Sequence, residues 1–389
     1  MKILFFNYEF EQEVGEAAHT CMSLLQQHSK NSQLEMDLVT ASADGQSHVL
    51  KMGDNITIYQ LPSGKKLAKP AYQSMKEPIS FVWDAFWFAR KLAKSNKYDV
   101  CHVYYSETFG RVAMLLKWWL KLPYIVSFQG SDWNGVAEKE MTRYKLQRPI
   151  AKKILSKSSF VVANSQWLRE IIVSTNPAKE VDVIHNGVDQ SFFFPDFSRR
   201  NPEQFKIVCA GDVSPITGVR FLIQAFKLLS GRYDHVRLLV VGDGNERKSL
   251  EDLVQGLELK DKVEFVGQVA SEKMPEYYQQ SDVLAWSSLK DGVSKTILEA
   301  MSCGLPVVAV ENIWTTEIIE NNISGLIAEK SNADDLAEKI EKLITDQEFR
   351  EKIVANTLAR AQKLSLEAVA GHYMDLYVKT ANLQNIRQD

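Results

Sequence analysis

Short apolar segments alternate with amphipathic segments along the whole chain. An apolar run of about four to eight residues is typical of a buried strand, and an apolar period of three to four residues is typical of a helix. Strands that are apolar at consecutive positions are expected in parallel sheets whose two faces are covered by helices. The predicted strands are 2–6, 36–40, 99–104, 124–128, 160–164 and 182–186, followed by 206–211, 237–242, 263–267, 282–286, 306–310 and 325–328.

This α/β pattern occurs twice, so the sequence predicts two domains. The chain has 389 residues, and single hydrophobic cores stop growing at about 250–300 residues. A polar stretch with a proline at residues 191–204 separates the halves, and we place the boundary near residue 195. The first domain is then 1–195 and the second 196–369, with a C-terminal helix over about 370–389 that packs back on the first domain.

Composition and charge argue against several classes of protein. Hydrophobic residues make up 45% and charged residues 24% of the chain, as in an ordinary globular protein. The net charge of −3 gives no general signal for nucleic-acid binding. The N-terminus lacks the cleavage region of a signal peptide, and no apolar run reaches the ~18–20 residues of a bilayer span. We therefore expect a cytoplasmic protein with four reduced, inert cysteines.

The segment DGVSKTILEAMSCGLPVVA at 291–309 carries the strongest chemical signal. Asp291 lies in a predicted loop, and a helix that begins near Ser294 places Glu299 more than one turn inside it. Free N–H groups and the positive end of the dipole make a helix start a site for phosphate. A carboxylate can accept hydrogen bonds from two neighbouring hydroxyls of a sugar or ribose. A solvated loop acid and a helix acid that faces water fit the same spacing.

This segment resembles the signature of the retaining glycosyltransferases of family 4. The similarity consists of two acids separated by seven residues, a helix of small residues, then Cys-Gly and Leu-Pro-Val-Val. Other segments match in the family's order, at 183–196, 209–226, 237–251, 263–269 and 281–288. The resemblance implies the GT-B fold, in which two doubly wound Rossmann-like domains face each other across a cleft.

The resemblance also implies a hexosyltransferase activity. Such an enzyme moves a sugar from a UDP- or GDP-linked donor to a glycan or lipid-linked acceptor, without a required metal, in bacterial-type surface polysaccharide or glycolipid synthesis. Glu299 would hold the ribose, and Asp291, where the family usually has Glu, would face the transferred sugar. The base would meet Gly267 and Gln268. The implied nucleotide-binding residues are Glu299, Gly211, Asp212, Thr217, Gly242, Gly244, Gly267, Gln268, Gly292, Val293, Ser294, Thr296 and Gly15.

Two kinds of alternative stay open for these residues. The glycines could serve turn geometry alone. The family's phosphate clamp of Arg and Lys is replaced by Asp212 and Thr217, although a diphosphate leaving group needs its charge neutralised. Lys295 is our candidate substitute cation, and an exposed first-turn lysine is its alternative. Asp212 could instead hold a divalent ion against the phosphate.

The first domain departs from the family as well. Near its start it has Gly15 where the family generally has two glycines. The segment SFQGSD at 127–132 resembles a family motif, with Gln129 where a donor-sugar histidine often stands. Gln129 can bond a sugar hydroxyl but cannot carry a proton, which a front-side retaining mechanism tolerates. The catalytic candidates implied by the resemblance are Asp291, Lys295, Gln129 and Asp132, the last as an acceptor-side or loop-ordering group.

A local basic surface suggests contact with a membrane. Arg143, Lys145, Arg148, Lys152, Lys153 and Lys157 follow one another at near-helical spacing. Trp118 and Trp119 stand between Lys117 and Lys121. Aromatic residues beside cations suit a membrane interface, so we expect peripheral contact at the inner membrane face. A solvated helix face with buried tryptophans is the alternative.

Three functions are compatible with these features. The first is an active retaining glycosyltransferase. The second is a non-catalytic GT-B module or partner subunit, suggested by the missing clamp cations. The third is a GT-B sugar-nucleotide epimerase.

Overall fold

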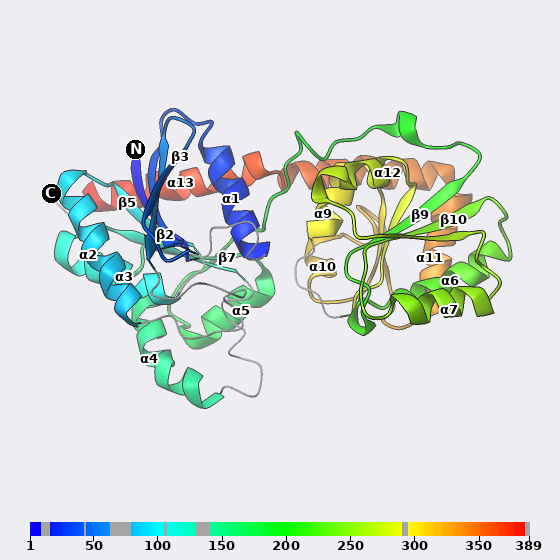
Figure 1. The fold of residues 1–389 in the computed structure, drawn as a ribbon, viewed down its shortest axis with the longest axis horizontal. Helices are drawn as coiled ribbons and strands as arrows, with labels where there is room; N and C mark the ends of the chain where they lie inside the picture. The colour runs from blue at the N-terminus through cyan, green and yellow to red at the C-terminus, as the bar shows by residue number, and fades with distance from the viewer. Residues whose placement is uncertain are drawn as a thin grey trace. The chain divides into compact units, whose positions relative to one another are not determined.

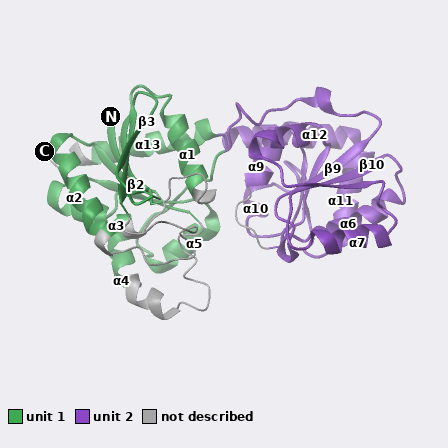
Figure 2. Ribbon diagram, in the orientation of Figure 1, with its two compact units in different colours: residues 1–187, 366–389 green, residues 188–365 purple. Residues whose placement is uncertain are grey.

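The computed structural model describes residues 1–8, 16–42, 44–62, 79–104, 107–129, 141–289 and 295–385. The chain forms two compact units, which Figure 2 shows in separate colours. Unit 1 comprises residues 1–187 and 366–389, and unit 2 comprises residues 188–365. The sequence predicts the domain boundary near residue 195 and a C-terminal helix that packs on the first domain from about residue 370.

Unit 1 is built on an eight-stranded sheet in the order β3-β4-β2-β1-β5-β6-β7-β8. Neighbouring strands are parallel except for β3 and β4, which pair antiparallel. The strands are β1 (Lys2–Phe6), β2 (Glu35–Ser42), β3 (His48–Met52), β4 (Ile56–Pro62), β5 (Val100–Tyr104), β6 (Tyr124–Phe128), β7 (Phe160–Ala163) and β8 (Asp182–Val183). The helices are α1 (Glu16–His28), α2 (Ile79–Ser95), α3 (Glu107–Leu120), α4 (Met141–Lys157), α5 (Gln166–Thr175) and α13 (Leu366–Asn385).

Helices cover both faces of this sheet. Helices α2, α3, α4 and α5 share one apolar core with the strands, and α1 and α13 share the other (Figure 1). The apolar sequence runs predicted every strand of this sheet except β3 and β4. The burial of β3 is low and that of β4 alternates, so neither has the continuous apolar run of a strand covered on both faces.

Unit 2 is built on a six-stranded parallel sheet in the order β11-β10-β9-β12-β13-β14. Its strands are β9 (Phe205–Ala210), β10 (Val236–Val241), β11 (Val263–Gly267), β12 (Val283–Trp286), β13 (Val307–Val310) and β14 (Leu326–Ala328). Its helices are α6 (Val219–Ser230), α7 (Arg247–Gly256), α8 (Met274–Gln279), α9 (Lys295–Ser302), α10 (Thr315–Ile318), α11 (Ala333–Thr345) and α12 (Gln347–Lys363).

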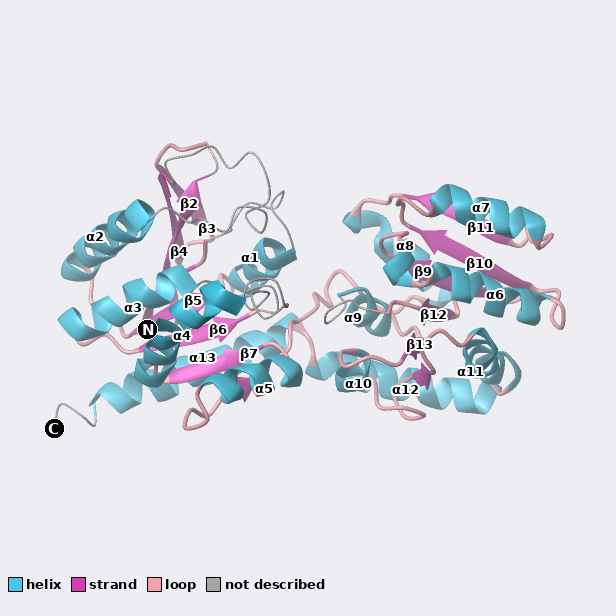
Figure 3. Cartoon of the chain, turned by 90° about the horizontal axis from the view of Figure 1, so that it is seen from below, coloured by secondary structure: helices cyan, strands magenta, loops and turns pink. Residues whose placement is uncertain are grey.

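Each central strand of unit 2 contributes to two cores. Ile207 and Cys209 of β9 pack with α6, α7 and α11, whereas Val208 and Ala210 pack with α9. Successive side chains of a strand point to opposite faces, so a strand with helices on both sides is apolar at every position. Figure 3 shows the helices that flank these strands. The parallel sheet of unit 2 and the largely parallel sheet of unit 1, with their flanking helices, confirm the predicted α/β fold class.

Helix α13 brings the end of the chain back to unit 1. Its Tyr377 hydroxyl lies 2.7 Å from Nδ1 of His102 on β5, and Nε2 of His102 lies 2.8 Å from Oγ of Ser127 on β6. The His102 and Tyr373 rings also pack together, 5.2 Å apart. A neutral imidazole donates through one nitrogen and accepts through the other, so these contacts tie α13 to the sheet without a buried charge.

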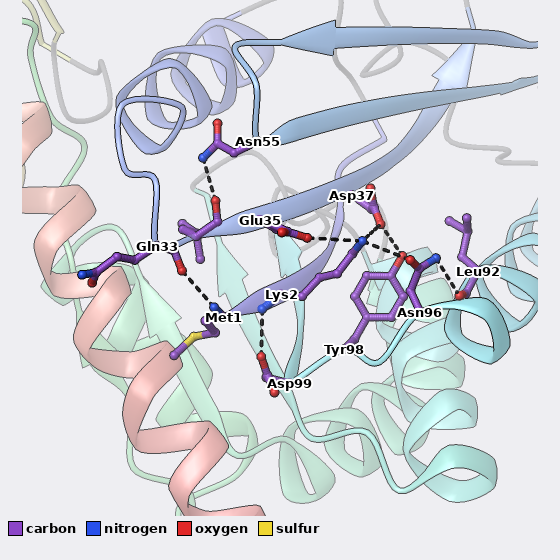
Figure 4. A network of polar contacts seen from close by, with 11 residues as sticks. Met1, Lys2, Gln33, Glu35, Asp37, Asn55, Leu92, Asn96, Tyr98 and Asp99 are labelled. Carbon is purple, nitrogen blue, oxygen red and sulfur yellow. Dashed lines mark hydrogen bonds and ion pairs between the residues drawn. The ribbon is translucent and has the colours of Figure 1, made fainter.

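Polar side chains form a network at the amino ends of strands β1 and β2 in unit 1, as Figure 4 shows. The Lys2 ammonium lies 3.3 Å from the Asp37 carboxylate, which also accepts a hydrogen bond from the Tyr98 hydroxyl. The Lys2 backbone N–H donates to Asp99, and its ammonium donates to Asn96. The network therefore joins β1 and β2 to the segment that leads from α2 into β5.

None of the helices described has the length and apolarity that a membrane span requires.

Because two histidines of unit 1 are buried, we expect unit 1 to lose stability in mild acid. Burial lowers the pKa of His102 to about 3 and that of His28 to about 4, against about 6.5 in the unfolded chain. Below pH 6.5 the unfolded state binds protons that the folded state does not. The free energy of unfolding should therefore fall by about 1.4 kcal/mol per pH unit and histidine as the pH drops toward 4.

Urea unfolding between pH 7.5 and 5 measures this slope. His102→Gln should make the slope shallower by about one proton, because the glutamine does not titrate. His235→Gln, at an exposed position in unit 2, is the matched control and should leave the slope unchanged. Equal slopes for the wild type and His102→Gln would show that His102 does not contribute.

Candidate functional site

The strand order of unit 2 reverses between β9 and β12. From β9 the chain adds β10 and β11 on one side, and from β12 it adds β13 and β14 on the other. In open parallel sheets, ligands bind at the carboxyl ends of the strands where the order reverses. The loops that follow β9 and β12 are therefore the expected ligand-binding loops of unit 2.

The loop after β9 packs tightly against the loop after β10. A Cβ atom at Gly242 would lie 1.8 Å from the Gly211 carbonyl oxygen, and one at Gly244 would lie 2.2 Å from the Val213 oxygen. Gly242 also has a φ of +139°, which strongly favours glycine. Close backbone approach thus explains Gly242 and Gly244 without a ligand, as the turn-geometry alternative allows.

Hydrogen bonds join the loop after β9 to the loop after β12. The Ser287 hydroxyl donates to the Thr217 carbonyl oxygen at 2.8 Å, and the Leu289 N–H donates to the Ile216 oxygen at 2.9 Å. The Thr217 hydroxyl donates to the Ser214 carbonyl and accepts from the Ser214 N–H. The Thr217 side chain is buried and stabilises its own turn, whereas Asp212 is exposed.

Helix α9 follows the β12 loop and carries a buried carboxylate. Glu299 is only 7% exposed. Its Oε1 lies 3.3 Å from the Lys295 ammonium, and its Oε2 accepts a hydrogen bond of 3.1 Å from the Tyr278 hydroxyl of α8. Burial raises the pKa of Glu299, while Lys295 and the Tyr278 hydrogen bond oppose that rise. Burying a charge is costly unless it is paired, so these two partners hold the carboxylate in place.

Tyr278 is a site residue that the sequence did not reveal. It is fully buried, and burial together with the neighbouring Glu299 raises its pKa well above the ordinary value. The phenol therefore stays protonated and remains a donor. It also interacts with the Thr296 side chain. The only sequence signal is a tyrosine in a short helix before β12, which the apolar core explains equally well.

The predicted residues Gly211, Gly267 and Gln268 follow or end strands at the same edge of the unit 2 sheet. Gly211 follows β9, and a Cβ atom there would lie 3.7 Å from the Trp286 ring at the end of β12. Gly267 ends β11 with a φ of +86°, and Gln268 after it is exposed. Arg247 lies beside Gly267 and forms ion pairs with Asp243 and Glu251.

Unit 1 also gathers polar side chains at the carboxyl ends of its strands. Gln129 follows β6 and is buried, and its side-chain oxygen accepts a hydrogen bond of 3.1 Å from Asn164, which follows β7. The Asn164 carbonyl oxygen lies 3.0 Å from Nδ1 of His185, after β8. Neither Asn164 nor His185 was predicted as a site residue. Three consecutive strands of the sheet therefore end in one polar row.

Several predicted residues lie outside the described residues, namely Gly15, Asp132, Asp291, Gly292, Val293 and Ser294. In the described parts of the chain, no three His, Cys, Asp or Glu side chains are grouped so that they could hold a metal ion. All four cysteines are buried and unpaired.

Comparisons with known proteins show the family to which this chain is similar. The family model described as "Glycosyl transferases group 1" matches residues 191–360, and that of "Glycosyltransferase Family 4" matches residues 32–192. An uncharacterized glycosyltransferase of Methanocaldococcus jannaschii is 26% identical over 314 residues, which cover 80% of this chain and 82% of that protein. The alpha-monoglucosyldiacylglycerol synthase of Streptococcus pneumoniae is 23% identical over 325 residues, 79% of this chain and 73% of that protein.

A solved structure has a similar fold. Anabaena Alr3699/HepE in complex with UDP has a TM-score of 0.70 at 18% identity, covering 97% of this chain and all of that one. At this level of identity the similarity concerns the fold.

The Tyr278 hydrogen bond should contribute measurably to stability at neutral pH. Tyr278→Phe leaves the buried Glu299 carboxylate with one donor fewer, and we expect the free energy of unfolding to fall by about 1–3 kcal/mol, the cost of an unsatisfied buried group. Urea unfolding at pH 7 measures the change. Tyr277→Phe, one position earlier and only partly buried, is the matched control. If both variants match the wild type, the hydroxyl does not support Glu299.

Proposed function

Because this chain belongs to the family 4 glycosyltransferases, which have the GT-B fold, we propose that it transfers a sugar from a nucleotide sugar to a glycan or lipid-linked acceptor with retention of configuration. The observation that carries the proposal is the buried Glu299 carboxylate, held by Lys295 and Tyr278 next to the point where the strand order of unit 2 reverses. A hydroxyl-rich ligand with a phosphate fits that combination of charges.

Glu299 is the proposed ribose-binding residue. A carboxylate accepts hydrogen bonds from both hydroxyls of a ribose diol, and its two present partners hold its oxygens in defined positions. The nucleotide would pass along Gly211, Gly242 and Gly244, with the base near Gly267. HepE, a protein of similar fold, was solved with UDP, which supports a uridine nucleotide, and GDP is the alternative.

Lys295 is the proposed cation for the diphosphate. Asp212 brings no positive charge, and the Thr217 hydroxyl is engaged within its turn. Lys295 is partly exposed at the start of α9, and its ammonium already faces a carboxylate. When ribose hydroxyls occupy Glu299, the ammonium can turn to the phosphate oxygens, whose charge grows as the sugar leaves. Asp291 is the proposed partner of the transferred sugar, and the 292–294 backbone and Thr296 are the proposed phosphate contacts.

Gln129 and Asp132 are the proposed unit 1 residues, on the sugar and acceptor sides, and Gly15 is a proposed close approach to the donor. One relative supports the lipid-linked class of acceptor, since the streptococcal protein is named for a glycosylated diacylglycerol.

A non-catalytic nucleotide-sugar-binding module is the second candidate. The observation that favours it is the lack of basic side chains at positions 212 and 217. Turnover of UDP-glucose and GDP-mannose, followed by product analysis, separates the candidates. Transfer or slow hydrolysis supports the transferase, and binding without turnover supports the module.

Glu299→Gln should weaken nucleotide binding. A neutral amide cannot accept from both ribose hydroxyls, so we expect a loss of about 1–3 kcal/mol, the range for hydrogen bonds to charged groups. Calorimetric titration with UDP and GDP measures it. Glu276→Gln, at an exposed position on α8, removes the same charge elsewhere and should bind like the wild type. Unchanged affinity of Glu299→Gln would remove Glu299 from the site.

Lys295→Ala should lower kcat by about 10²-fold or more, as the loss of one oxyanion donor does in other enzymes. Lys295→Arg keeps the charge and should retain much of the activity. In the non-catalytic alternative Lys295→Ala is silent, whereas Asp212→Arg raises diphosphate affinity by supplying the missing cation. Donor turnover and UDP affinity of these variants distinguish the two. A silent Lys295→Ala in an enzyme with normal turnover would show that the helix start alone binds the phosphate.

A further inference from the structure

Helices α2 and α3 of unit 1 expose four tryptophans. Trp83, Trp87, Trp118 and Trp119 are 52%, 51%, 80% and 50% exposed, and we call them the tryptophan ridge. The Trp119 ring centroid lies 6.3 Å from those of Trp87 and Trp118, and Trp83 contacts the same Phe86 ring as Trp87. Contiguous exposed apolar surface marks a site of interaction. The exposure also rules out the alternative in which Trp118 and Trp119 are buried.

A cation is built into the ridge. The Arg90 guanidinium lies 5.1 Å from the Trp87 ring centroid and 4.3 Å from that of Trp119. Such cation–π contacts hold the rings and the charge in one surface. The Arg90 Nε atom is buried and has no hydrogen-bond partner among the described residues, so the two rings take the place of a polar partner.

The surface around the ridge is strongly basic. Helices α2, α3 and α4 carry eleven Lys and Arg residues but only two acids, Asp84 and Glu107, in a chain whose net charge is −3. The exposed lysines around the ridge are Lys91, Lys94, Lys121, Lys152, Lys153 and Lys157. The Lys117 ammonium donates to the Lys157 carbonyl oxygen at 2.6 Å, which places the end of α4 beside the start of the Trp118-Trp119 pair.

The three helices lie side by side on one face of the sheet, with α2 against α3 and α3 against α4 (Figure 1). The exposed residues of these helices therefore include both the four tryptophans of the ridge and several lysines. Protein–protein interfaces are depleted in lysine. At membrane surfaces, by contrast, tryptophan sits among the headgroups and lysine is attracted to anionic lipids.

We propose that the tryptophan ridge and the lysines of α2 and α4 dock unit 1 on the surface of an anionic phospholipid bilayer. The tryptophans enter the headgroup region while the lysine ammonium groups bind lipid phosphates. The purpose of docking rests on the proposed function, because docking brings the enzyme to an acceptor presented in the membrane. Docking itself needs neither donor nor turnover.

Co-sedimentation of the full chain with vesicles tests the proposal. We expect binding to a two-to-one mixture of phosphatidylcholine and phosphatidylglycerol, little binding to phosphatidylcholine alone, and loss of binding at high salt. Brominated phosphatidylcholine in the anionic vesicles should quench tryptophan fluorescence. Trp118→Ser, at the most exposed ring, should reduce both the binding and the quenching.

Charge reversal gives a matched pair of variants. Lys152→Glu with Lys153→Glu should weaken vesicle binding about tenfold or more. Lys248→Glu with Lys352→Glu changes the net charge equally at exposed positions of unit 2 and should bind like the wild type. The melting temperatures of all variants show that they are folded.

Three outcomes would overturn the proposal. The first is a wild-type chain that stays in solution with anionic vesicles at low salt. The second is an equal loss of binding in the two charge-reversed pairs, which would show that only total charge matters. The third is a Trp118→Ser variant that binds vesicles like the wild type but sediments at a different velocity in the absence of vesicles. That result would show that the ridge is an interface between protein chains. A failure of sugar transfer with vesicle binding intact would count against the proposed function alone.

Discussion

The reversal of strand order between β9 and β12 is the constraint on which the candidate site in unit 2 depends. Strands added on opposite sides of this pair carry their connecting loops in opposite directions. The loops after β9 and β12 are left facing each other, and the bonds from Ser287 to Thr217 and from Leu289 to Ile216 hold them together. Helix α9 follows the second loop, so its charged side chains arrive at the same edge.

Glu299 illustrates how a buried charge can be prepared for a ligand. The free energy of burying the carboxylate is offset by an ammonium from its own helix and a phenol from α8. Lys295 is four residues away and can move, whereas Tyr278 is fixed in the core. One partner can therefore be exchanged for ligand hydroxyls while the other keeps the carboxylate in position.

The two units distribute their polar groups differently. In unit 2 the buried carboxylate of Glu299 lies between Lys295 and Tyr278. In unit 1, Gln129 and Asn164 are buried and His185 is half-buried at the strand ends, while helices α2, α3 and α4 together carry eleven Lys and Arg residues and only two acids. A net charge of −3 for the whole chain conceals this uneven distribution.

The sequence by itself determined the strands that are covered on both faces, because a buried parallel strand must be apolar at every position. It also determined that Glu299 lies inside a helix, since helix boundaries depend on neighbouring residues. Only the tertiary structure decided that Tyr278 meets Glu299, that the Ser287 hydroxyl bonds the Thr217 carbonyl oxygen, and that the tryptophans of α2 and α3 face outward. The periodicity of a segment shows which side chains share a face, but which element covers that face depends on packing between distant parts of the chain.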